Sequence, residues 1–265
     1  MEEKLKAFGK LLEIMDRLRA ECPWDRKQTF ESLRKLTIEE TYELADAILK
    51  ADSGEIKNEL GDLLLHIVFY AKIGSEQCGF DILDVLHTIN EKLIYRHPHI
   101  YGNVKVKDDE EVKHNWEELK LKEGNRTVLG GVPGSLPALV KANRIQEKVR
   151  GVGFDWEKKE EIWEKLDEEI EEVKHELSRM ESDISAAEGL FQKIEEEFGD
   201  LFFTLINAAR LYGIDPENAL ERTNIKFIKR FNLLEEMTRK KGKKLPELTI
   251  EEMDQFWEEA KVSEK

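Results

Sequence analysis

Two short acidic patterns, EExxE and ExxD, occur in this order in the first half of the chain and again in the second half. The first half reads IEETYE at 38–43 and NELGDLL at 58–64, and the second half reads DEEIEE at 167–172 and EEFGDLF at 196–202. Residues three and four positions apart are neighbours on an α-helix, so each pattern places its carboxylates on one helix face. If the two helices of a half pack antiparallel, their carboxylates meet.

Carboxylates crowded in this way repel one another, and partial burial beside the apolar stretch at 60–73 strengthens the repulsion. Protonation relieves it, and a divalent cation relieves it better. Oxygen ligands favour Mg²⁺ or Mn²⁺ over zinc or copper, and Mg²⁺ commonly also binds substrate phosphates. The alternative is a solvated glutamate face, which is common in acidic chains. Because both patterns repeat, each with a Gly-Asp pair that opens an apolar stretch, we favour a metal site.

A third repeated block carries positive charge, since NEKLIYR at 90–96 matches NIKFIKR at 224–230. Each block has a lysine and an arginine four residues apart on one helix face: Lys92 and Arg96, and Lys226 and Arg230. Such cations could form surface ion pairs, which contribute little each. They could also bind phosphate oxygens that no metal holds. The shared spacing favours phosphate binding.

The elements that position these groups are expected to be helices. Apolar residues recur at helical spacing through 162–177, and the nearly all-apolar stretch at 60–73 predicts a buried helix. GIDPENAL at 213–220 predicts a helix start with Asp215 as the N-cap. Strand-like alternation is weak throughout. We therefore predict an all-α fold of two homologous helical-bundle domains in tandem, each with about four helices.

The glycines and prolines of KEGNRTVLGGVPGSLP at 122–137 mark the boundary between the repeats. We expect an N-terminal helical domain at 1–121, a linker at 122–136 and a C-terminal helical domain at 137–265. The two acidic patterns lie nine residues further apart in the second half, where the extra polar sequence around 178–189 predicts a longer connection between helices.

Composition excludes several classes of function. A net charge of −15 disfavours binding to a nucleic-acid polymer, whose backbone is also negative. No apolar run approaches the ~20 residues that span a bilayer, and the N-terminus is unlike a signal peptide, so we expect a cytoplasmic protein with no membrane partner. The two cysteines form no CxxC pair. No P-loop, GxGxxG or GxSxG motif occurs, so phosphates must be bound without a glycine-rich cradle.

The chain resembles the MazG family of nucleoside triphosphate pyrophosphohydrolases in its tandem-domain form. The resemblance rests on EExxE followed by ExxD in both halves and on five further stretches: CPWDRKQT (22–29), RHPHIYG (96–102), NWEELK (115–120), VPGSLPALVKANRIQEKVRGVGFDW (132–156) and KIEEEFGDL (193–201). It covers essentially the whole chain. It implies Mg²⁺-dependent cleavage of nucleoside triphosphates between the α and β phosphates, on several bases, by a homodimer that removes unwanted nucleotides.

The resemblance also implies roles for individual residues. The metal ligands would be Glu40, Glu43, Glu59 and Asp62 in the first half, and Glu169, Glu172, Glu197 and Asp200 in the second half. The nucleotide would contact Lys193, Glu196, Lys226, Arg230 and Trp257 in the second half, and Lys92 and Arg96 in the first half. Lys120 would reach a phosphate across the dimer. Apart from the resemblance, hydrolysis by a metal-bound carboxylate site would let the leading glutamate of each EExxE, Glu39 or Glu168, position the attacking water or accept its proton.

The two halves are not identical, because Asn58 stands where the second half has Glu196. Both ligand sets are intact, so either half, or both, could be active. Trp257 could stack on a base or only anchor the last helix. Two other functions also fit the sequence. One is a narrow-specificity pyrophosphohydrolase of the dUTPase-like or phosphoribosyl-ATP type. The other is a non-catalytic nucleotide-sensing interaction module, which would not need two intact carboxylate sets.

Overall fold

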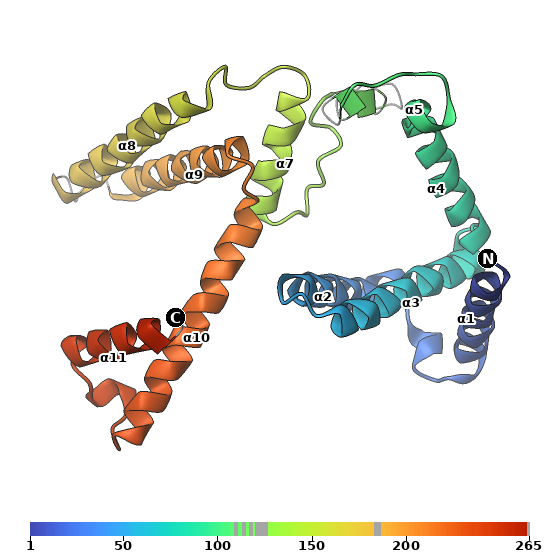
Figure 1. Cartoon of the computed structure of the whole chain (residues 1–265), viewed down its shortest axis with the longest axis horizontal. Helices are drawn as coiled ribbons and strands as arrows, with labels where there is room; N and C mark the ends of the chain where they lie inside the picture. Colours follow the sequence, from blue (N-terminus) through green and yellow to red (C-terminus); the bar gives the residue numbers. More distant parts are fainter. Residues whose placement is uncertain (109–110, 113–114, 117–118, 120–126, 183–186, 264–265) are drawn as a thin grey trace. The chain divides into compact units, whose positions relative to one another are not determined.

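The computed structural model describes residues 1–108, 111–112, 115–116, 119, 127–182 and 187–263 (Figure 1). Within these residues the protein is helical and has no β-strand, which confirms the all-α prediction. None of the described helices has a stretch long and apolar enough to cross a membrane. The chain divides into two compact units, Met1–Asp108 and Asp109–Lys265. The domain boundaries expected from the sequence stay predictions, because 120–126 lie outside the described residues.

The first unit is built around an antiparallel pair of helices. Its elements are α1 (Glu2–Glu21), η1 (Asp25–Lys27), α2 (Phe30–Leu49), α3 (Ser53–Gln77), α4 (Ile82–Arg96) and α5 (Pro98–Tyr101). Only three residues join α2 to α3, so the two helices run back along each other (Figure 1). Asp52 ends this short connection as the N-cap of α3, accepting hydrogen bonds from the backbone N–H groups of Gly54 and Glu55. The core joins α1, α2 and α3 through Met15, Leu33, Val68, Phe69 and Ile73.

The second unit repeats this arrangement. Its elements are α7 (Ala138–Arg150), η2 (Lys159–Glu161), α8 (Ile162–Ser182), α9 (Ala187–Leu211), α10 (Pro216–Lys240), η4 (Leu245–Glu247) and α11 (Ile250–Ser263). Helices α8 and α9 lie side by side, as α2 and α3 do (Figure 1). Asp215 caps α10 by accepting a 2.8 Å hydrogen bond from the backbone N–H of Asn218, so the helix start predicted there is confirmed.

The prediction of a longer connection in the second half is wrong. Counted from the last glutamate of EExxE, α8 continues four residues further than α2 does. Counted back from the glutamate of ExxD, α9 begins four residues earlier than α3 does. Each extension adds about one helical turn. Residues 178–182 therefore belong to α8 and residues 187–189 to α9, and residues 183–186 lie outside the described residues. The polar sequence continues the helices because Glu, Arg, Met and Ala are all good helix formers.

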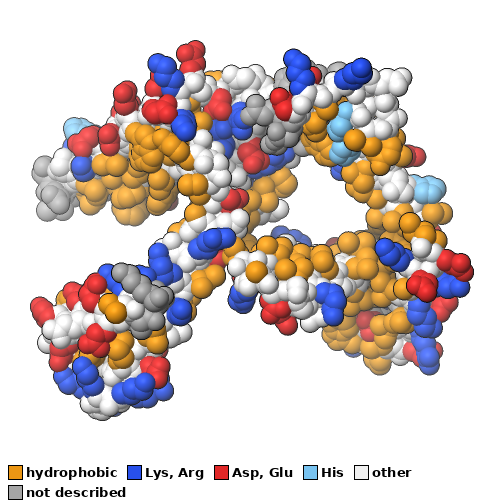
Figure 2. Space-filling model, viewed as in Figure 1, with side chains coloured by type: hydrophobic (Ala, Val, Ile, Leu, Met, Phe, Trp, Pro, Cys, Tyr) orange, Lys and Arg blue, Asp and Glu red, His pale blue; other side chains and the backbone are white. Residues whose placement is uncertain are grey.

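The apolar stretch at 60–73 is buried on one side only, which corrects the expectation of a fully buried helix. His66, Val68, Phe69, Ala71 and Ile73 are buried. Leu60, Leu64 and Ile67 are exposed along one stripe of α3. The equivalent residues of α9 are exposed too: Phe198, Phe202 and Leu205. Hydrophobic side chains accordingly appear on the surface of both helix pairs in Figure 2. A two-helix layer has neighbours on one side, so its other face stays open within its own unit.

Truncation of Ile73, which is 0% exposed in the core of the first unit, should be costly. We expect Ile73→Ala to lower the free energy of unfolding of this unit by about 2–5 kcal/mol, because the cavity left behind relaxes only in part. The matched control is Ile48→Ala on α2, where the side chain is 56% exposed and the change should stay within about 0.5 kcal/mol. Urea unfolding followed by far-ultraviolet circular dichroism measures both. Equal effects would contradict the described core.

Candidate functional site

The first unit brings three glutamates together at the face shared by α2 and α3. One carboxylate oxygen each of Glu40, Glu43 and Glu59 lies within 4.8 Å of the other two. Glu59 is only 8% exposed, and its Oε2 has no hydrogen-bond partner among the described residues. A buried carboxylate oxygen without a donor is costly. Among the described residues, no donor therefore offsets the charge at this oxygen.

The pKa values of this cluster rise for the same reason. Burial raises the pKa of Glu40, and the negative charges of Asp62, Glu43 and Glu39 raise it further, against a small opposing hydrogen bond with Glu59. The pKa of Glu59 is raised by burial first, and then by the charges of Glu43 and Asp62. Asp62 is therefore close enough to act on both groups, although it is not within the 4.8 Å cluster.

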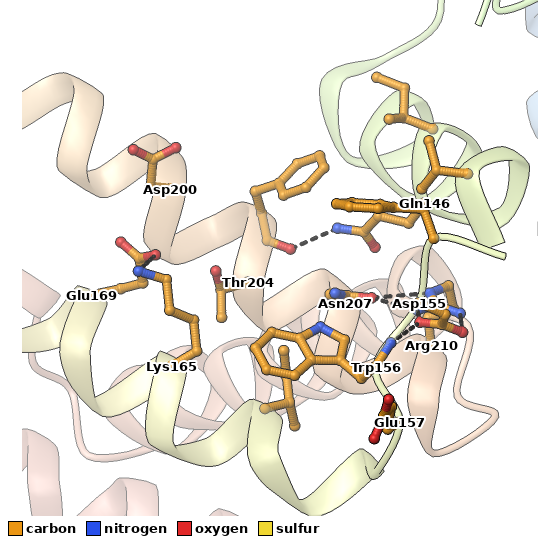
Figure 3. A pocket seen from close by; sticks show the side chains of 15 residues that line it. Gln146, Asp155, Trp156, Glu157, Lys165, Glu169, Asp200, Thr204, Asn207 and Arg210 are labelled. Carbon is orange, nitrogen blue, oxygen red and sulfur yellow. Dashed lines mark hydrogen bonds and ion pairs between the residues drawn. The ribbon is translucent and has the colours of Figure 1, made fainter. Parts of the chain in front are cut away.

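The second unit has the same cluster at the equivalent positions. Oxygens of Glu169 and Glu172 on α8 and of Glu197 on α9 lie within 4.8 Å of one another, and Glu169 is 5% exposed. Burial raises the pKa of Glu172, and its hydrogen bond with Glu169 and the nearby charge of that residue raise it further. Asp200 is not within the 4.8 Å group. It faces the same cavity as Glu169 (Figure 3).

A cation already lies beside this second cluster. The ammonium group of Lys165 is 2.9 Å from a carboxylate oxygen of Glu168 and 3.0 Å from one of Glu169. Hydrogen bonds to these two carboxylates raise the pKa of Lys165, so it stays protonated. One lysine does not neutralise three clustered glutamates. Both clusters, with oxygen ligands only and an unsatisfied oxygen on Glu59, fit a hard divalent cation.

A cavity of about 570 Å³ extends from the second cluster between α7, α8 and α9. Figure 3 shows Lys165, Glu169 and Asp200 at one end and Gln146, Asn207 and Arg210 at the other end. Between them lie the side chains of Thr204 and Trp156. The volume is in the range of small-molecule sites. The acidic residues Glu169 and Asp200 lie at one end of the cavity.

An ion pair closes the far end of this cavity. Arg210 donates to both carboxylate oxygens of Asp155, one of them at 3.1 Å. Burial acts to raise the pKa of Asp155, but the hydrogen bonds from Arg210 and the backbone N–H of Trp156, with the charges of Arg210 and Arg150, outweigh it and hold the pKa below its usual value. The pair ties the segment that carries Trp156 to α9.

Most of the nucleotide-contacting residues expected from the sequence lie away from this cavity. Lys193 and Glu196 are exposed on α9. Lys226 and Arg230 lie on α10, and the ring of Trp257 packs 5.0 Å from that of Phe227, so this tryptophan at least anchors α11. In the first unit, Lys92 and Arg96 lie on α4. Glu39 and Glu168 are exposed beside their clusters. Lys120 lies outside the described residues. All these roles stay predictions.

Sequence reasoning missed the residues of the cavity itself. Lys165 could have been found, because it lies four residues before Glu169 on one helix face. Gln146, Asn207 and Arg210 gave no such signal, since they come from α7 and the end of α9 and meet only in the folded chain.

Comparison with known proteins agrees with this geometry. The profile of the MazG nucleotide pyrophosphohydrolase domain matches twice, at residues 28–101 and 157–234, and each match contains one carboxylate cluster. The nucleoside triphosphate pyrophosphohydrolase/pyrophosphatase MazG of Thermotoga maritima is 42% identical over 98% of both chains. The nucleoside triphosphate pyrophosphohydrolase of Escherichia coli K12 is 38% identical over 98% of this chain and 99% of its own. The uncharacterized protein YabN of Bacillus subtilis is 43% identical, and this chain spans 54% of its length. Two matching domains and near full-length similarity make this chain a member of the MazG nucleotide pyrophosphohydrolase family.

Proposed function

We propose that the protein hydrolyses nucleoside triphosphates to nucleoside monophosphate and pyrophosphate, with Mg²⁺ as cofactor and Mn²⁺ as a possible substitute. The observation that carries this proposal is the repeated glutamate cluster, in which a buried oxygen of Glu59 has no hydrogen-bond partner in the part of the chain that the structure describes. Relatives named as nucleoside triphosphate pyrophosphohydrolases over nearly their whole length support it. The cytoplasmic location expected from the sequence stays a prediction.

In this proposal each half holds its metal through the three clustered glutamates together with Asp62 or Asp200. A bound Mg²⁺ supplies charge neutralisation at the phosphate oxygens and polarises the bond to be cleaved. Glu39 and Glu168, at the exposed edge of the clusters, position the attacking water and accept its proton. The water oxygen bonds to the α phosphorus. The bond between this phosphorus and the oxygen that bridges the α and β phosphates breaks, and pyrophosphate leaves with that oxygen.

Cations of the chain would bind the phosphate oxygens that remain. Lys165 already lies at the carboxylate end of the cavity and can turn from Glu168 toward a phosphate. Lys193, Lys226 and Arg230 would serve the second half, and Lys92 and Arg96 the first half. We expect several bases to be accepted. A panel of nucleoside triphosphates separates this expectation from the narrow-specificity alternative, which a single accepted base would favour.

We further propose a homodimer. The matching exposed stripes on α3 and α9 support it, because monomeric proteins rarely expose contiguous apolar surface of this kind. A stripe at equivalent positions of two homologous units suits a self-complementary interface.

The carboxylate assignment predicts loss of turnover in the double variant Glu40→Gln/Glu169→Gln. We expect pyrophosphate release in the presence of Mg²⁺ to fall by about 100-fold or more, because each cluster loses a charged ligand while its shape is kept. Circular dichroism should show unchanged helicity. The matched control is Glu171→Gln, because Glu171 lies on the same helix as Glu169 but is exposed and outside the cluster. The two single variants show which half turns over. Unchanged pyrophosphate release in the double variant would refute the assignment.

Metal binding should depend on pH with a defined sign. The pKa values of Glu40, Glu59 and Glu172 are raised above 4.5, so the folded protein binds more protons than the unfolded chain. Without metal, the folded protein therefore loses stability as the pH rises through these raised pKa values. Mg²⁺ binds the ionised carboxylates. We therefore expect Mg²⁺ to raise the melting temperature more at pH about 8 than at pH about 5, where protons compete with it. Differential scanning calorimetry with and without Mg²⁺ measures this, and an equal rise at both pH values would contradict the proposed ligands.

The dimer proposal predicts that a charge in the α9 stripe breaks the assembly. Phe202→Asp places a carboxylate at the centre of the exposed stripe, and we expect it to convert a dimer to a monomer. Light scattering coupled to gel filtration gives the mass of each form. Ile250→Asp, an exposed apolar side chain on α11 outside the stripe, should leave the mass unchanged. A monomeric wild-type protein at micromolar concentration would overturn the proposal.

A further inference from the structure

The end of the second-unit cavity away from the carboxylates carries a buried hydrogen-bond acceptor with no partner. Gln146 on α7 is 3% exposed. Its Nε2 donates a 2.8 Å hydrogen bond to the backbone carbonyl of Phe203, which orients the amide. Its Oε1 has no hydrogen-bond partner among the described residues and lies in the wall of the cavity. A buried acceptor held in this way is poised for a donor on a ligand.

Asn207 supplies a second fixed amide beside it. Its Oδ1 accepts hydrogen bonds from Nε and Nη2 of Arg210, at 3.0 and 2.7 Å. Arg210 is itself held by Asp155. Because the oxygen of Asn207 is engaged on this side, its NH₂ group points away from the guanidinium. In Figure 3 the Gln146 amide lies on one side of the cavity and the indole ring of Trp156 on the other side. An acceptor, a donor and an aromatic face therefore meet at this end.

The distance to the carboxylates suits a nucleoside. Asp200 and Asn207 are seven residues apart on α9, which corresponds to a rise of about 10 Å along the helix. If the metal proposed at Glu169 and Asp200 holds the phosphates, the ribose and base would extend past Thr204 toward Gln146.

We propose that this cavity binds the nucleobase of the triphosphate, with Gln146 Oε1 accepting a hydrogen bond from an N–H group on the edge of the base. The proposal rests on the proposed pyrophosphohydrolase function. Adenine and cytosine carry such a donor on their exocyclic amines, guanine on N1 and N2, and uracil and thymine on N3. A single fixed acceptor therefore admits all the standard bases and rejects analogues that lack the donor.

Among the described residues, the first half does not repeat the polar end of this cavity. Aligning the two Gly-Asp pairs places Asn207 opposite Phe69 and Phe203 opposite Leu65. Phe69 is 2% exposed in the core of the first unit, where it packs with Met15 and Val68. The position that holds a polar amide in one half is thus filled by core in the other half. The two halves share the carboxylate cluster and differ in what lies behind it.

The test compares matched pairs of nucleotides that differ by one donor: ATP with purine riboside triphosphate, and UTP with N3-methyl-UTP. We expect kcat/KM to favour the member with the donor by about ten-fold, because the analogue leaves the buried acceptor unpaired. In Gln146→Leu this ratio should fall toward one. The matched control is Gln77→Leu, an exposed glutamine at the end of α3, which should retain the wild-type ratio.

Ratios near one for both pairs in the wild-type protein would overturn the proposal, even if Gln146→Leu failed to fold. An unchanged ratio in a folded Gln146→Leu variant would overturn it too. Binding of the non-hydrolysable α,β-imido forms of the same pairs, measured by calorimetry, keeps this outcome separate from the proposed activity. Absence of pyrophosphate release with every nucleotide would refute the activity, while a ten-fold difference in binding would still support the pocket.

Discussion

Carboxylates converging from two neighbouring helices are the constraint on which the rest of the structure depends. In each unit, carboxylate oxygens of three glutamates lie within 4.8 Å of one another. One glutamate of each cluster, Glu59 or Glu169, is buried. Like charges at that separation destabilise the fold unless a cation or protons offset them. Glutamates dispersed over the surface would give the same net charge without this repulsion. The two clusters are therefore best explained by the binding site that they create.

The helices are arranged to hold these clusters rather than to fill a large core. The pairs α2 with α3 and α8 with α9 form the walls, and α1 and α7 pack behind them. In the second unit, the tie between Asp155 and Arg210 secures the segment behind the carboxylates. The front face of each pair is apolar and exposed within its own unit. A site of this kind is built on rigid helices, which hold ligand oxygens more accurately than loops do.

Duplication preserved the charged frame and let the surroundings diverge. Both units keep EExxE and ExxD at the same places on paired helices. Behind the cluster, the first unit has Phe69 within its core, and the second unit has Asn207, oriented by Arg210, beside an open cavity. Two sites that share metal chemistry can in this way differ in how they hold the rest of a substrate.

The sequence alone determined the fold class, the repeat and the glutamates that cluster, because helical periodicity and three- and four-residue spacings are local properties that the printed chain displays. It also identified the start of α10 at Asp215. It misjudged the polar insert near 178–189, where good helix formers lengthened α8 and α9, and the burial of α3, which depends on how many neighbours a helix has. Only the tertiary structure decided that Gln146, Trp156 and Asn207 line one cavity. They come from separate segments, and no spacing along the chain relates residues that meet by packing.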